Sequence, residues 1–147
     1  MPHSAQNEQC VFCSIVAGTL RSAIVFEDEA TLAFLDITAV APGHTLVIPK
    51  AHARDLWEIA PDDWAAVGRT VHRMAQRIGD VLQPAGMTLF QANRDTGWQD
   101  VFHLHVHLVP RTEADRLHRP WTASPVPLDS LEDIRLRLSL REDDFAR

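Results

Sequence analysis

The chain has 147 residues, of which 46% are hydrophobic, and a formal net charge of −6 at pH 7. This length is typical of one globular domain with a real core, and no apolar run approaches the roughly 18 to 20 residues that a membrane span needs. The acidic balance argues against a sequence-independent binder of nucleic acid polymers, which would need a basic stripe. Residues 1–9 are polar, without the basic and apolar regions of a signal peptide, so we expect a flexible N-terminus and a cytoplasmic protein.

The first predicted element is a short helix over residues 10–17, which contains the chain's two cysteines, Cys10 and Cys13, and ends at Gly18. A Cys-x-x-Cys pair indicates either a thioredoxin-like redox pair or half of a zinc site. Redox pairs of that type follow a strand and open a longer helix, whereas no strand precedes Cys10. Half of a zinc site is therefore favoured, with histidines elsewhere completing it.

Three strands are predicted next. Two short apolar runs, residues 23–27 and 31–35, are separated by three residues and form a hairpin. A Pro-Gly turn at 41–44 leads into a strand over 45–48, which Pro49 ends because proline cannot donate to a strand ladder.

A long amphipathic helix begins at Pro61, followed by two acids that suit the positive end of the helix dipole. Its apolar residues recur every three or four positions, which predicts a core-facing or dimer-facing stripe: Trp64, Val67, Val71, Met74, Ile78 and Val81. Residues 84–86 break the helix. A strand over 87–92 and a loop over 93–100 then lead back into the next strand, so these two strands should pair antiparallel.

That next strand, predicted over residues 102–110, alternates histidine with aliphatic residues. A period of two is the period of a β-strand, so His103, His105 and His107 should share one face. Same-face side chains stand roughly 6.5 to 7 Å apart along a strand, too far for all three to bind one ion without help. This spacing suits three histidines that have distinct roles along an elongated substrate.

After this strand, residues 112–147 are rich in proline and charge and form an arm with a short helix near residues 131–138.

These motifs together resemble those of histidine-triad (HIT) proteins. The matching residues are the Cys10/Cys13 pair, Phe-Leu-Asp-Ile at 34–37, Pro-Gly-His and the strand after it at 42–52, and Gln-Asp-Val-Phe-His-Leu-His-Val-His at 99–107. The resemblance covers residues 10–111 and implies an α+β HIT domain there. Its fold would be an antiparallel sheet of about five strands with one long amphipathic helix and a short N-terminal helix. The resemblance also implies a homodimer and no organic cofactor.

The activity implied by the resemblance is hydrolysis at the α-phosphorus of small purine nucleotide conjugates of the nucleoside phosphoramidate type. By position, His105 resembles the nucleophile that forms a covalent nucleotidyl-histidine intermediate, with its other ring nitrogen held by a backbone carbonyl. His107 would contact the phosphate or the leaving atom. His44 resembles the histidine of the neighbouring strand that abuts the triad.

The resemblance also implies a substrate pocket. Asp36 would accept both ribose hydroxyls, which the paired oxygens of a carboxylate suit. The apolar slot for the base would be formed by Ile37, Phe12 and Ile15, and the polar loop residues that hold the phosphate would be Asn93 and Gln99. The chain departs from the family pattern at Trp98, where glycine is common. This indole would either narrow the phosphate pocket or give the loop a different path.

A zinc-bearing branch of the superfamily carries Cys-x-x-Cys together with a histidine just after the Pro-Lys pair. By that match, a structural zinc ion would be held by Cys10, Cys13, His52 and His103. Such a closed site would attach the N-terminal helix to the sheet and leave no position for a metal-bound water. Without zinc, His103 would instead belong to the phosphate site.

Other functions stay open. One is a dinucleoside polyphosphate hydrolase or a nucleotidyl transferase, although transferases of this superfamily replace the third histidine with glutamine and this chain keeps His107. Another is a non-catalytic nucleotide-binding or partner-binding protein. A zinc hydrolase is disfavoured because no Asp or Glu is evident as a base beside the triad.

Overall fold

The computed structural model describes residues 9–145, so the expected flexible segment 1–9 lies, apart from its last residue, outside the described residues. The chain divides into two compact units, one ending at Asp115 and one beginning at Arg116. The two are described separately.

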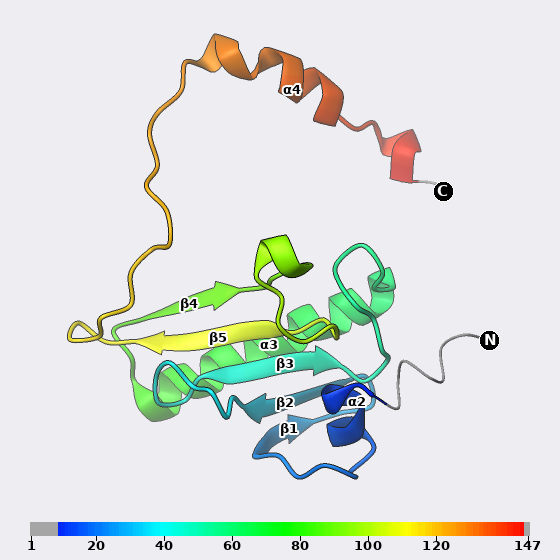
Figure 1. Ribbon diagram of the computed structural model, residues 1–147, viewed down its shortest axis with the longest axis vertical. Coiled ribbons are helices and arrows are strands. Elements are labelled where there is room, and N and C mark those ends of the chain that lie inside the picture. Colours follow the sequence, from blue (N-terminus) through cyan, green and yellow to red (C-terminus); the bar gives the residue numbers. More distant parts are fainter. Residues whose placement is uncertain (1–8, 146–147) are drawn as a thin grey trace. The chain divides into compact units, whose positions relative to one another are not determined.

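The first unit is built on a five-stranded antiparallel sheet with strand order β1-β2-β3-β5-β4 (Figure 1). This confirms the α+β fold expected from the sequence, including the short and the long helix. Its elements are α2 (Val11–Val16), β1 (Ile24–Glu27), β2 (Thr31–Leu35), β3 (Thr45–Pro49), α3 (Pro61–Leu82), β4 (Gly86–Phe90), the 3-10 turn η1 (Asp95–Gly97) and β5 (Val106–Arg111).

The two faces of the sheet bury different residues because side chains alternate along a strand. Helix α3 covers one face (Figure 1), where the core consists of Ala33, Val47, Val67, Met74, Ile78, Val106 and Leu108. The opposite face packs against α2 through Phe12, Ile15, Leu32, Phe34, Leu46 and Ile48. His107 lies opposite Leu46 in the β3–β5 register, which places it on the face of α2.

The boundaries of α3 follow from its sequence. Proline occupies its first turn together with Asp62 and Asp63, and the helix ends where Gln83 adopts a left-handed conformation just before Pro84. The buried residues of the helix include Val67, Met74 and Ile78, so the middle of the predicted apolar stripe faces the core, whereas Trp64 and Val81 at its two ends are exposed.

The predicted histidine strand is wrong at its beginning, because β5 starts only at Val106. Strand β3 pairs with β5 only as far as Val106. Beyond that point the carbonyl of Pro49 accepts a hydrogen bond from the ring of His103 at 2.8 Å instead of from a strand N–H. The backbone N–H of Leu104 turns to the carbonyl of Ala53 at 2.7 Å. Only His107 of the three histidines therefore lies within a strand.

The second unit holds the 3-10 turn η2 (Leu128–Leu131), helix α4 (Glu132–Leu138) and the 3-10 turn η3 (Glu142–Phe145). A short helix was expected near residues 131–138, and α4 spans Glu132–Leu138. Inside it, Arg135 pairs with Glu132, one turn earlier, at 2.7 Å. Within residues 9–145, no helix combines the length and the apolar character that crossing a membrane requires.

Gly43, in the turn before β3, has φ of +84°, a conformation that side chains with a Cβ adopt at a cost. A Cβ there would also overlap the side chain of Leu82. We expect Gly43→Ala to lower the free energy of unfolding by about 1–2 kcal/mol. Gly68→Ala, in the exposed middle of α3 with nothing near the added carbon, should instead raise it by about 0.5–1 kcal/mol. Urea unfolding of both variants checks this, and equal effects would contradict it.

Candidate active site and metal centre

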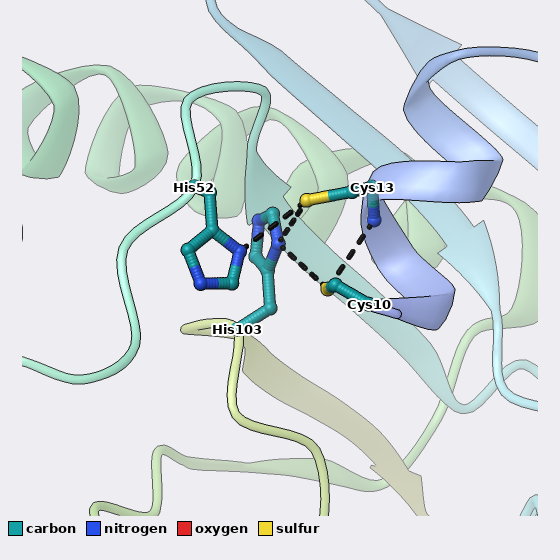
Figure 2. Close-up of side chains that lie close together, drawn as sticks. All are labelled: Cys10, Cys13, His52 and His103. Carbon is teal, nitrogen blue, oxygen red and sulfur yellow. Dashed lines mark hydrogen bonds between the residues drawn. The ribbon is translucent and has the colours of Figure 1, made fainter. Parts of the chain in front are cut away.

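Four side chains from three distant parts of the sequence converge beside α2. Figure 2 shows the thiols of Cys10 and Cys13, at the start of α2, facing the rings of His52 from the loop after β3 and His103 from the segment before β5. The ligand atoms of all four lie within 4.8 Å of one another. The structure thus brings together the four residues expected to bind metal.

The donor distances fit a tetrahedral ion. The Nδ1 atom of His103 lies 3.5 Å from both sulfur atoms, and the Nδ1 atom of His52 lies 3.3 Å from the sulfur of Cys13. Zinc–sulfur bonds of about 2.3 Å and zinc–nitrogen bonds of about 2.0–2.1 Å place tetrahedral sulfur and nitrogen ligands about 3.5 Å apart. Because Nε2 of His103 donates its proton to the Pro49 carbonyl, Nδ1 carries the lone pair and faces the thiols.

Burial determines the protonation of two of these side chains. Burial, together with the neighbouring rings of His52 and His105, lowers the pKa of His103 to about 4, so the ring is neutral and able to ligate. Burial and the adjacent Cys10 thiol raise the pKa of Cys13 to about 12. A cation held between the two sulfurs would remove this penalty, since a metal binds the thiolate form.

His105 is buried and has its two ring nitrogens in different surroundings. Its Nδ1–H donates to the carbonyl of His103 at 2.7 Å, which is the backbone contact expected of the nucleophile. This hydrogen bond leaves the lone pair on Nε2. The ring of Phe12 meets that of His105 edge-to-face, with ring centres 5.2 Å apart, and so fixes its orientation from α2.

His44 and His107 form a hydrogen-bonded pair, as expected for a histidine that abuts the triad. The Val40 N–H donates to Nδ1 of His44, so Nε2 of His44 carries the proton and donates to Nδ1 of His107 at 2.9 Å. The remaining Nε2–H of His107 is then a donor. Burial lowers the pKa of His107 to about 4, with the His105 and His44 rings adding to the effect, and burial also lowers the pKa of His44.

Asp36 lies beside this pair, 3.5 Å from Nε2 of His44 and 4.0 Å from Nδ1 of His107. Burial raises its pKa, but hydrogen bonds from the backbone and hydroxyl of Thr38 and the nearby imidazoles leave the pKa below its ordinary value. It borders an open hollow of about 390 Å³ whose lining is Leu35, Asp36, Ala39, Val40, Ala41, Pro42, Gly43 and His44.

The residues expected to form the base slot have different environments. Phe12 and Ile15 are buried on α2, and Phe12 packs against Phe34 as well as His105. Ile37 is 95% exposed. Ile37 follows Asp36 directly and projects into solvent, so the structure does not bring it into the cluster of the other two.

The loop between β4 and β5 is held by the side chains expected at the phosphate. The Oδ1 atom of Asn93 accepts from the Leu56 N–H at 2.7 Å. The buried Gln99 accepts from the Arg94 N–H at 2.7 Å and donates to the Val101 carbonyl at 3.0 Å. Both side chains therefore make backbone contacts that shape the loop.

Trp98 has φ of +72°, the left-handed conformation that glycine adopts most easily, and its indole is 65% exposed. The loop therefore keeps the turn that a glycine would make at this position, and the indole projects outward.

Two neighbours of the triad were missed by the sequence reasoning. The Oδ1 atom of Asp100 lies 3.4 Å from Nε2 of His105, so the expectation that no Asp or Glu is placed as a base beside the triad is wrong at Asp100. The ring of Phe90 stacks on His107 with ring centres 4.0 Å apart. Phe90 is paired with His107 across β4 and β5, so the hairpin register was the signal that could have identified it.

The arrangement combines a fixed imidazole lone pair, a neighbouring N–H donor and a carboxylate beside an open hollow. An imidazole in this state can attack an electrophilic centre, and the N–H of His107 can stabilise charge that develops next to it. Such a site suits the transfer, through a covalent intermediate on the imidazole, of a group that carries a polar substituent.

Comparisons with known proteins agree with this geometry. The HIT domain profile matches residues 17–114. Protein hit of Bacillus subtilis is 43% identical over 109 residues, which cover 74% of this chain and 74% of that protein. A histidine triad nucleotide-binding protein from Candida albicans superposes with a TM-score of 0.80 at 29% identity, covering 94% of this chain and 98% of that one. A Zn-bound histidine triad family protein from Mycobacterium smegmatis has a TM-score of 0.72 at 34% identity, covering 96% and 99%.

The lowered pKa of His107 predicts acid sensitivity. A histidine with pKa about 4 in the folded state and about 6.5 when unfolded contributes stability fully above pH 6.5 and loses it as the pH falls toward 4. We expect this contribution to be about 1–2 kcal/mol after solvent screening. His107→Gln should flatten the pH dependence of the free energy of unfolding between these two pKa values. The titration of Asp36 affects this free energy only below that window, because the pKa of Asp36 is lowered from its ordinary value. Denaturant titrations of both proteins with equal metal content test this, and parallel curves would refute it.

Proposed function

The chain belongs to the HIT domain family, and from this membership and the site we propose that it is a purine nucleotide hydrolase. It would cleave at the α-phosphorus of small nucleotide conjugates of the nucleoside phosphoramidate type. The observation that carries the proposal is the hydrogen bond from Nδ1 of His105 to the His103 carbonyl, which leaves a lone pair on Nε2.

In the proposed reaction, Nε2 of His105 attacks the α-phosphorus and forms a nucleotidyl-histidine, while the bond to the leaving group breaks. The Nε2–H of His107 stabilises a phosphoryl oxygen or the departing atom by hydrogen bonding, and the departing nitrogen takes up a proton from solvent and leaves as an amine. His44 keeps His107 in the required tautomer. Water then cleaves the phosphorus–nitrogen bond, which releases the nucleotide and restores His105.

We assign the ribose to the hollow bordered by Asp36, whose carboxylate would accept its hydroxyls. Phe12 and Ile15 remain the proposed base slot, with Phe12 also positioning His105, whereas Ile37 projects into solvent away from both. Asn93 and Gln99 would act on the phosphate by setting the path of the loop that precedes the triad.

We further propose that Cys10, Cys13, His52 and His103 bind a structural zinc ion. The donor set and its distances support this, as does the Zn-bound relative from M. smegmatis. The ion would hold α2 against the segment that leads into β5. It would have no part in the chemical steps.

The proposal includes a homodimer. Strand β4 is an outer strand of the sheet and carries Leu89 and Phe90, each nearly half exposed, which suit such a contact.

We assign residues 10–111 to the HIT domain and 112–147 to an appended arm. A cytoplasmic location fits a site that needs reduced cysteines.

The covalent step has a direct test. Brief mixing with adenosine 5′-phosphoramidate at low temperature should add the mass of one adenylyl group to the wild-type chain and none to His105→Ala. His107→Ala should still bind nucleotide but form or resolve the adduct about 10²-fold more slowly. Intact-protein mass spectrometry provides the measurement. Tight nucleotide binding without adduct or product would reject hydrolysis in favour of a binding protein.

The zinc proposal is tested with two histidines. We expect the wild-type protein to bind one zinc ion per chain and His52→Ala to bind less. The Tm of His52→Ala should be lower by on the order of 10 °C, because metal binding adds directly to folding free energy. His72→Ala, an exposed histidine of α3, is the matched control and should keep both values. Native mass spectrometry and thermal melts are the readouts. Equal zinc content in the two variants would disprove the assigned ligand set.

A further inference from the structure

The proposed mechanism leaves Asp100 without a role, although its carboxylate is 3.4 Å from the atom that attacks phosphorus, Nε2 of His105. We infer that Asp100 is a specificity-determining residue that selects against leaving groups with negative charge and so favours conjugates of neutral or cationic amines. This inference rests on the proposed function and names the charge of the group that the site releases.

The position of Asp100 is set by the backbone. Its Oδ1 atom also accepts a hydrogen bond from the Val101 N–H at 2.9 Å, and the preceding residue, Gln99, is buried and bonded to the backbone on both sides. The Asp100 side chain itself is 76% exposed. The backbone therefore holds Asp100 in place next to His105, and the rest of its side chain faces solvent.

The carboxylate lies where a substrate must arrive. Reacting atoms approach to about 3–3.5 Å before a bond forms, so the α-phosphorus must come as close to Nε2 of His105 as Oδ1 of Asp100 now is. Substrate therefore displaces the Asp100 side chain, which its exposure allows. The short aspartate stem keeps the displaced carboxylate beside the reacting phosphoryl group.

The surrounding charges do not neutralise this carboxylate. Asp36 brings a second carboxylate to the other end of the row, against His44 and His107. The arginines of the two loops that contact Gln99, Arg54 and Arg94, both pair with the buried Asp55 and together carry one positive charge more than it does. The negative field is therefore local: a leaving group meets it where Asp36 and Asp100 lie against the histidines.

This field discriminates between leaving groups and not between nucleotides. The α-phosphate carries the same charge in every substrate, so its repulsion from Asp100 is common to all of them. A polyphosphate or carboxylate leaving group adds negative charge within a Debye length of Asp100, whereas an amine adds none or a positive charge. Asp100 should thus act on the ratio of rates for differently charged leaving groups.

A matched substrate pair isolates this effect. Adenosine 5′-phosphoramidates of 1,2-diaminoethane and of β-alanine share the phosphorus–nitrogen bond and have leaving groups of similar length, one ending in an ammonium and one in a carboxylate. The wild-type protein should have the higher kcat/KM for the ammonium substrate, and this preference should weaken as salt is raised. Asp100→Asn, which keeps the shape and removes the charge, should lower the preference about tenfold.

The control variants separate charge from folding. Asp100→Glu keeps the charge and should keep most of the preference, and Asp100→Ser is a second uncharged variant that should lose it. Asp95→Asn, an exposed carboxylate in η1 of the same loop, should leave the preference unchanged.

The outcomes can be told apart. An unchanged preference in Asp100→Asn and Asp100→Ser, with both substrates still hydrolysed, overturns the role of Asp100 and leaves the proposed function standing. Absence of any turnover and of any His105 adduct in the wild-type protein overturns the proposed function, and this inference with it.

Discussion

The hydrogen bond from Nε2 of His103 to the carbonyl of Pro49 is the constraint on which the rest of the site depends. It replaces a strand hydrogen bond at the point where β3 and β5 stop pairing, and it fixes the tautomer of His103 so that Nδ1 faces the two thiols. It also holds the His103 backbone, whose carbonyl accepts the Nδ1–H of His105. One contact thereby orients both the proposed metal-binding group and the proposed nucleophile.

Helix α2 connects these two functions. Its first turn carries Cys10 and Cys13, and its inner face carries Phe12, which touches the rings of His103 and His105. A helix of six residues has little stability of its own, because nucleation is costly. Packing on the sheet and a bound ion would both keep it in place. The metal group can therefore influence the chemistry through position alone.

The second feature of the site is its charge. The imidazoles are buried, and burial lowers the pKa values of His44 and His107, while Asp36 and Asp100 bring carboxylates to the two ends of the row. A neutral imidazole is a nucleophile and hydrogen-bond donor, whereas an imidazolium lacks the lone pair. Burial thus favours the neutral form of His44 and His107, and the carboxylates restrict what can approach the histidines.

The sequence by itself determined the hairpin over β1 and β2, the strand before Pro49, the long helix and the antiparallel pair of β4 and β5, because hydrophobic periodicity and turn residues are local signals. Resemblance added the group of Cys10, Cys13, His52 and His103. Only the tertiary structure decided that β5 begins at Val106, since that depends on the distant carbonyl of Pro49. It likewise placed Asp100 against His105 and Phe90 on His107, because the path of a loop and contacts between strands are fixed by packing and not by spacing along the chain.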